Sequence, residues 1–137
     1  MKLKLLMSLL GIMLLSLVSC DNDKISPRKE GDWDDNIKLS KKEFNISSSS
    51  STVTVFTEND GWWLNGIRLN NESVDLTKMN LLSKNFVITK SEFQVERKDG
   101  KTIIITMNQN TTNADRVLYV SLQNGDYFDG VAVIQSK

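Results

Sequence analysis

The segment Phe93–Met107, FQVERKDGKTIIITM, contains the strongest indication of the fold. Asp99-Gly100 interrupts two runs in which apolar and polar side chains alternate, which is the pattern of a β-hairpin. A three-residue loop, Lys98–Gly100, would place Arg97 opposite Lys101. In that register one face carries the apolar side chains Phe93, Val95, Ile103, Ile105 and Met107. We therefore expect this hairpin to supply part of a hydrophobic core.

Short runs of β-branched and aromatic residues recur through the rest of the chain. The predicted strands are residues 37–39, 44–46, 52–57, 86–89, 93–97, 102–107, 116–122 and 131–135. Clusters of Gly, Asn, Asp and Ser separate them, and no long segment has helical periodicity. This spacing predicts an all-β sandwich of about seven to eight strands. Residues 73–82 fit either a short helix or an irregular crossover between sheets.

A second hairpin is predicted within Gly61–Leu69, GWWLNGIRL. Asn65-Gly66 favours a type I′ turn, because both residues tolerate a positive φ. Since directly paired residues share a face, the turn would create one apolar face of Trp62, Leu64, Ile67 and Leu69. Trp62 is therefore expected in the core, with Trp63 on the opposite face beside Arg68.

Trp63 has two interpretations. Arg68 can lie over the indole and shield it, in a cross-strand cation–π pair worth about 0.5–1 kcal/mol. Alternatively, the indole is a platform on which a sugar ring stacks, with Arg68 donating hydrogen bonds to the hydroxyls. The first interpretation is favoured, because isolated exposed aromatic residues are common on proteins that bind nothing there.

Further exposed aromatic residues are expected in a loop at 123–130, QNGDYFDG, between the last two strands. Phe128 is expected to plug the end of the sandwich, whereas Tyr127 can either do the same or contact a glycan together with Asp126. The spacing of the acidic residues here matches no calcium loop. The candidate glycan-binding residues are Trp63, Arg68, Tyr127 and Asp126.

The N-terminal twenty residues are similar to a bacterial lipoprotein signal. Two lysines precede an apolar run at 5–18, which is long enough for a signal peptide and short for a membrane span. It ends Leu17-Val18-Ser19-Cys20, which resembles a lipobox, and Cys20 is the single cysteine of the chain. This pattern favours lipidation of Cys20 over an ordinary secretory signal or an N-terminal membrane anchor. The expected organisation is a signal peptide at 1–19, a tether at 20–34 and one domain at 35–137.

Composition excludes several functions. The chain has no histidine, which removes Ser-His-Asp and Cys-His catalysis and histidine metal sites. An acylated Cys20 leaves no thiol nucleophile, and no acidic residue has a recognisable catalytic context, so we expect neither an enzyme nor a metal or cofactor. Loss of the signal peptide with its two lysines leaves fifteen basic against seventeen acidic residues. Without a basic patch, nucleic-acid binding is not expected.

The C-terminal half also carries a recurring set of short motifs. They are Phe93-x-Val95, Asp99-Gly100, Ile103-Ile104-Ile105, Asn108-x-Asn110, Arg116 and the closing Val131-x-Val133-Ile134-Gln135. Upstream, a serine-rich turn, the strand 52–55 and a tryptophan after Asn59-Asp60-Gly61 fit as well. Together they resemble the BACON domain (Bacteroidetes-associated carbohydrate-binding, often N-terminal). The resemblance implies an immunoglobulin-like sandwich on a surface lipoprotein of a Bacteroidetes organism.

Two functions of different classes follow. The first is a non-catalytic module that binds a glycan or glycoprotein and is held on the outer membrane by its lipid, at the cell surface rather than the periplasmic face. The second is a structural spacer, or an accessory subunit that docks on an outer-membrane protein complex through protein contacts.

Overall fold

The computed structural model describes residues 33–137, so Cys20, the expected signal peptide and most of the tether lie outside the described residues. The described part of the chain contains strands and no helix. The strands are β1 Glu43–Ile46, β2 Ser51–Phe56, β3 Trp63–Leu69, β4 Glu72–Ser73, β5 Phe86–Thr89, β6 Phe93–Lys98, β7 Thr102–Met107, β8 Arg116–Asn124 and β9 Tyr127–Gln135. Among residues 33–137, no helix is long and apolar enough to cross a membrane.

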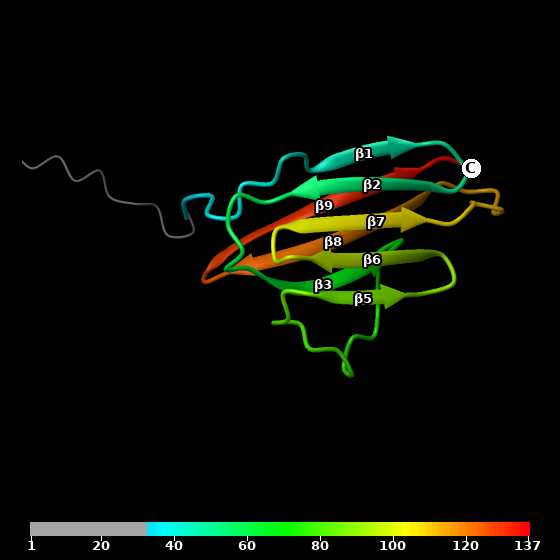
Figure 1. The fold of residues 1–137 in the computed structure, drawn as a ribbon. Helices are drawn as coiled ribbons and strands as arrows, with labels where there is room; N and C mark the ends of the chain where they lie inside the picture. Colours follow the sequence, from blue (N-terminus) through cyan, green and yellow to red (C-terminus); the bar gives the residue numbers. More distant parts are fainter. Residues whose placement is uncertain (1–32) are drawn as a thin grey trace, which may run out of the picture. The chain divides into compact units, whose positions relative to one another are not determined.

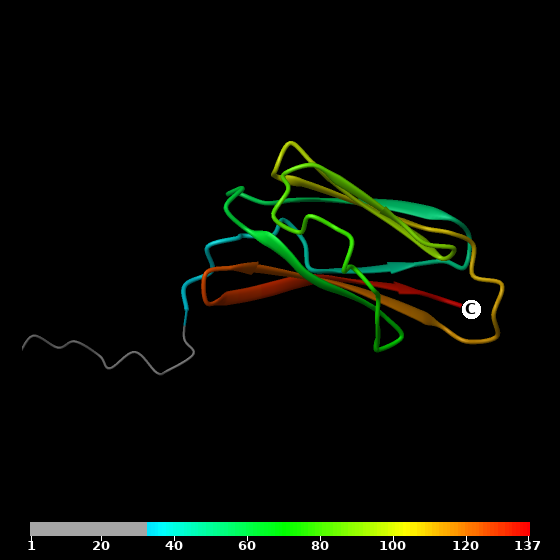
Figure 2. The same cartoon turned by 90° about the horizontal axis from the view of Figure 1, so that it is seen from below.

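The strands form two sheets that lie as two layers (Figures 1 and 2). One sheet has the order β1-β9-β8-β3-β4 and the other has the order β2-β7-β6-β5. β1 runs parallel to β9, and the other pairs are antiparallel. Sheets of these strand orders, packed face to face, make an immunoglobulin-like β-sandwich, which confirms the predicted fold class. The predicted strand at 37–39 is reduced to one bridge, between Leu39 and Thr57.

The β6–β7 hairpin has the predicted faces in a different register. Its loop is Asp99–Lys101, with Lys98 opposite Thr102. Asp99 and Gly100 have φ values of 51° and 73°, which a tight turn requires. Because the pairing is displaced by two residues, every side chain keeps its predicted face. All five apolar residues expected in the core are buried there: Phe93, Val95, Ile103, Ile105 and Met107.

The predicted turn at Asn65-Gly66 is wrong. β3 continues through these residues and pairs with β8, with an irregularity between Leu64 and Gly66 that makes a β-bulge. The turn lies instead at Asn70-Asn71, with φ values of 51° and 69°, and β4 returns from it. The pairing of β3 with β8 joins more residues than a short hairpin at Asn65-Gly66 could, which favours the continuous strand. Asn70 and Asn71 tolerate a positive φ as Asn65 and Gly66 do, so the turn can form there instead.

The bulge nevertheless preserves the predicted faces. One extra residue in a strand reverses the alternation of side chains, as the predicted hairpin turn would have done. Trp62, Leu64 and Ile67 are therefore buried in the core, as expected. Trp63 and Arg68 do lie on the other face, but they are not neighbours across strands. Trp63 is opposite Gln123, and Arg68 is opposite Tyr119.

A buried arginine closes each end of the core. At the end that holds the β6–β7 turn, the Arg97 guanidinium lies over the Trp62 ring, 3.5 Å from Cζ to the ring centroid. It donates hydrogen bonds to the carbonyl oxygens of Gly100, Ser83 and Asp60, at 2.9–3.1 Å. Burial lowers the pKa of Arg97 below its usual value. These carbonyls satisfy the donors of a charge that would otherwise be costly to bury.

At the opposite end, marked by the C-terminus in Figure 1, Arg116 donates from Nε and Nη2 to Gln135 Oε1, at 3.1 and 2.7 Å. The Gln135 amide donates in turn to the carbonyls of Ser48 and Ser49, which precede β2 in the other sheet. Asn110, also buried, donates to the carbonyls at 114 and 136. Three residues that carry the BACON resemblance are thus structural hydrogen-bonding groups that join the sheets.

Residues 74–85, which connect β4 to β5, form an irregular crossover without a helix, the second of the two predicted alternatives. Two backbone hydrogen bonds attach the crossover to β3. The Leu64 amide donates to the Leu81 carbonyl at 3.2 Å, and the Val74 amide donates to the Ile67 carbonyl at 2.9 Å. The crossover therefore covers the open edge of β3 and forms one wall of a groove beside this strand.

Candidate binding groove on the five-stranded sheet

The outward-facing side chains of β3, β8 and β9 lie in cross-strand rows. The first three rows are Trp63–Gln123–Phe128, Gly66–Ser121–Gly130 and Arg68–Tyr119–Ala132. Directly paired residues share a face, and rows on one face are about 7 Å apart along the strands. The middle row consists of two glycines and a serine. A trough of small residues, covered at Gly130 by the Tyr119 ring, therefore separates a row with two aromatic side chains from the row that contains Arg68.

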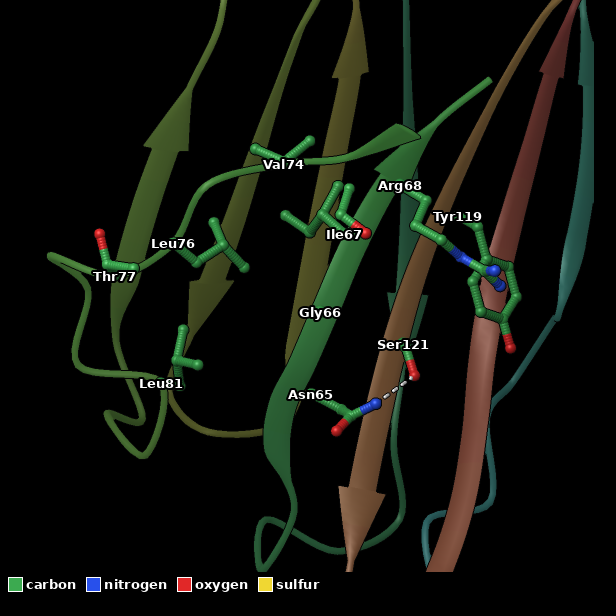
Figure 3. Close-up of a pocket in the computed structure, with 11 residues that line it drawn as sticks. Asn65, Gly66, Ile67, Arg68, Val74, Leu76, Thr77, Leu81, Tyr119 and Ser121 are labelled. Carbon is green, nitrogen blue, oxygen red and sulfur yellow. Dashed lines mark hydrogen bonds between the residues drawn. The ribbon is translucent and has the colours of Figure 1, made fainter. Parts of the chain in front are cut away.

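At its β3 end this trough opens into a groove of about 500 Å³, a volume typical of small-molecule sites. The lining residues are Asn65, Gly66, Ile67, Arg68, Ser73, Val74, Leu76, Thr77, Leu81, Tyr119 and Ser121. In Figure 3, Asn65, Arg68, Tyr119 and Ser121 lie on one side of β3, over β3 and β8, whereas Ile67 and the crossover residues Val74, Leu76, Thr77 and Leu81 lie on the other side. The groove thus has a polar wall of amide, hydroxyl and guanidinium groups and an apolar wall.

Gly66 leaves the floor of the groove open. A Cβ atom at this position would have no heavy atom within 4 Å. The φ angle of Gly66 is not positive, so the backbone conformation itself does not require glycine at this position. A ligand can therefore approach the main chain of β3 here. Beside it, the Asn65 amide donates to Ser121 Oγ at 3.1 Å and fixes the orientation of both groups (Figure 3).

Tyr119 and Arg68 form the far side of the groove. The Tyr119 ring lies over Gly130, where an added Cβ would be 2.5 Å from the ring Cζ atom. Gly130 is thus the residue that allows the ring to lie across β9. The Arg68 guanidinium is placed over the same ring, with Cζ 5.3 Å from its centroid. The expected Trp63–Arg68 cation–π pair is therefore replaced by an Arg68–Tyr119 pair.

Tyr127 and Asp126 do not join Trp63 and Arg68. The segment at 123–130 is not a loop, because β8 and β9 extend to a two-residue turn at Gly125-Asp126. In the extended strand, Tyr127 has the inward orientation and packs against the core, while Asp126 is exposed in the turn. Phe128 points outward and is 56% exposed. The prediction that Phe128 plugs the end of the sandwich is wrong, and Tyr127 takes that place.

Charged neighbours fix Tyr127. Its hydroxyl donates to Asp129 Oδ2 at 3.2 Å, and Lys42 Nζ lies 2.7 Å from the same oxygen. Burial, together with the charges of Asp129 and Asp35, raises the pKa of Tyr127 to about 12. The hydrogen bond to Asp129 raises the pKa of Lys42 as well. Within residues 33–137, no group of three or more acidic side chains is arranged to hold a metal ion.

Of the four candidate residues, only Arg68 lines the groove; Trp63 is half-buried in the adjacent row. Three further polar residues of the groove, Asn65, Tyr119 and Ser121, are not among the site residues predicted from the sequence. Alternation along β8 does indicate that Tyr119 and Ser121 point outward, between the buried Leu118, Val120 and Leu122. Their proximity to Arg68 depends on which strand lies next to β8, and no local signal gives that.

No model of a known protein family matches the sequence, and no curated protein matches it significantly. Solved structures share the fold. A Bacteroides thetaiotaomicron protein determined by NMR has 20% identity and a TM-score of 0.57, covering 73% of this chain and 86% of its own. A Bacteroides ovatus GH5 xyloglucanase has 16% identity and a TM-score of 0.48, covering 73% of this chain but 18% of the enzyme. The M1 domain of titin has 8% identity and a TM-score of 0.44, covering 72% and 91%. At such identities the likeness concerns the fold alone.

Proposed function

We propose that this chain is a non-catalytic, lipid-anchored, BACON-like module of the outer membrane that binds a glycan or glycoprotein at the cell surface. The observation that carries the proposal is the groove at Gly66, with its polar wall of Asn65, Arg68 and Ser121. Sugar hydroxyls need several donors and acceptors at once, and amide, guanidinium and hydroxyl groups supply them. The groove is open to solvent, as binding to an extended glycan requires.

Aromatic surface next to the groove supports the same function. Tyr119 lines it, and Trp63 and Phe128 lie one row away on the same face. The C–H faces of a sugar stack on such rings while its hydroxyls reach the polar wall. A glycan longer than one residue can therefore run from the groove across the trough toward Trp63.

A glycan array probed with the full-length protein in detergent tests the proposal. The decisive variant is Gly66→Val, which fills the floor of the groove and places a β-branched residue in a strand conformation that tolerates it. We expect the variant to lose glycan binding while its unfolding free energy changes by less than about 1 kcal/mol.

Thr54→Val is the matched control, because Thr54 is exposed on the four-stranded sheet, away from the groove. Its binding should equal that of the parent. If no glycan on the array is bound, the glycan proposal is overturned in favour of the alternative expected from the sequence, a spacer or accessory subunit of an outer-membrane complex. If Gly66→Val binds as the parent does, the groove is not the site.

A further inference from the structure

Three arginines lie within residues 33–137, and two of them are buried and hydrogen-bonded to protein groups. Arg97 donates to three backbone carbonyls, and Arg116 donates to Gln135 and to the Asn108 carbonyl. Arg68 differs from both. It is exposed, and within the described residues its guanidinium makes no hydrogen bond and no ion pair; its one specific contact is with the Tyr119 ring. The donors of Arg68 are therefore available to a ligand.

Among the described residues, none that lines the groove around Arg68 carries a carboxylate. Its eleven lining residues include one cation and no anion. Glu72 on β4 is opposite Leu69, so it belongs to the other face of the sheet. Glu43, in the same cross-strand row as Tyr119, is three strands from Arg68, a separation of about 14 Å at the usual strand spacing. Within residues 33–137, no carboxylate forms an ion pair with the Arg68 guanidinium.

The contact with Tyr119 leaves the N–H groups of the Arg68 guanidinium without hydrogen-bond partners among the described residues. A guanidinium that lies over an aromatic ring directs its N–H groups outward in its own plane, and in that plane it binds a carboxylate through two parallel hydrogen bonds. The Asn65 amide and the Ser121 hydroxyl lie on the same wall and can bond to hydroxyls of the same sugar. The polar wall thus combines one site for an anion with sites for hydroxyls.

We infer that the groove recognises an acidic glycan, in which the carboxylate of a uronic or sialic acid residue is bound by Arg68. This inference rests on the proposed function and specifies its ligand class. Neutral glycans offer hydroxyls to the same polar wall but bring no negative charge to the Arg68 guanidinium. A sulfate ester offers the same charge with tetrahedral oxygens, and the planar guanidinium favours the planar carboxylate.

Matched ligand pairs test the inference by calorimetry with the full-length protein in detergent. The pairs are oligogalacturonate with its methyl ester, and sialyllactose with lactose; sulfated lactose tests the sulfate ester. At least one acidic member should bind at least tenfold more tightly than its neutral partner, and its affinity should fall as salt is added. Arg68→Gln should reduce that affinity at least tenfold, and Arg68→Lys should restore only part of it, because lysine lacks the fork.

Lys98→Gln removes one exposed positive charge from the other sheet and should change the affinity less than twofold. Equal binding of acidic and neutral partners would overturn the inference and leave the proposed function standing. Equal losses for both classes in Arg68→Gln would also overturn it, as would a preference for the sulfate ester. If no ligand of either class binds here or on the array, the proposed function fails together with the inference.

Discussion

At residue scale, two adjacent tryptophans have different roles. Trp62 is buried beneath Arg97 and donates from Nε1 to Thr57 Oγ1 at 3.0 Å. Trp62→Ala should therefore lower the unfolding free energy by about 3–5 kcal/mol, since it opens a cavity and removes the ring under a buried charge. Trp63→Ala should cost on the order of 1 kcal/mol, because Trp63 is only half-buried. Denaturant unfolding measures both; similar losses would contradict this assignment.

Tyr127 provides a second prediction at the same scale. Its pKa is raised to about 12 by burial and by Asp129, against about 10 in an unfolded chain. The folded state therefore holds the phenolic proton more tightly, and this contribution to stability is complete below pH 10 and is lost between pH 10 and 12. Titration of the phenolate absorbance should show a component near pH 12 that disappears in Tyr127→Phe. Persistence of that component in the variant would refute the assignment.

The inward or outward orientation of a side chain was predictable where the alternation of apolar and polar residues continues from a correctly predicted strand. The inward orientation of Trp62 and the outward orientation of Trp63 follow from the sequence even though the assumed turn does not exist, because a bulge changes parity as a hairpin does. The loop predicted at 123–130 leaves the orientation of Tyr127 open and gives Phe128 the wrong one, because β8 and β9 continue through this segment. Continuing the alternation backward from Val131 gives their observed orientations.

At the scale of elements, the position of the β3–β4 turn can be tested by substitution. Asn71 has φ 69°, so Asn71→Val should destabilise the fold by about 1–2 kcal/mol, the cost of a β-branched side chain in the left-handed region. Gly66→Val should be nearly neutral, since Gly66 lies within β3. Chemical denaturation of both variants checks this. A severe loss in Gly66→Val with a neutral Asn71→Val would indicate that the turn lies at Asn65-Gly66.

Strands with strict alternation, bounded by Gly, Asn and Asp, were found from the sequence together with the β6–β7 pairing, whereas the pairing of β3 with β8 was not. The faces of β6 and β7 follow from Asp99-Gly100, although the register differs by two residues. The turn predicted at Asn65-Gly66 is wrong because turn propensity is a local property, whereas the pairing of β3 with β8 joins residues far apart in the chain. For the same reason the groove, which needs both strands and the crossover, could not be assembled from local patterns.

For the whole molecule, the expected anchor lies outside the described residues and remains a prediction. Cys20→Ser should prevent acylation and move the protein from the membrane fraction to the soluble fraction, because the lipid chains supply the apolar area that holds it. Fractionation with detection of the lipid by mass spectrometry measures both effects. A variant that stays in the membrane fraction without lipid would contradict the lipobox interpretation.

NMR chemical-shift mapping of isotope-labelled protein tests whether the proposed glycan-binding site lies at the groove on the five-stranded sheet. Addition of an acidic glycan should shift the amides of Asn65, Gly66, Tyr119 and Ser121, together with the side-chain signals of Arg68. Signals from the outer face of the four-stranded sheet, such as Thr54, should stay unchanged. Shifts confined to that sheet or to the Gly125-Asp126 turn would contradict the account.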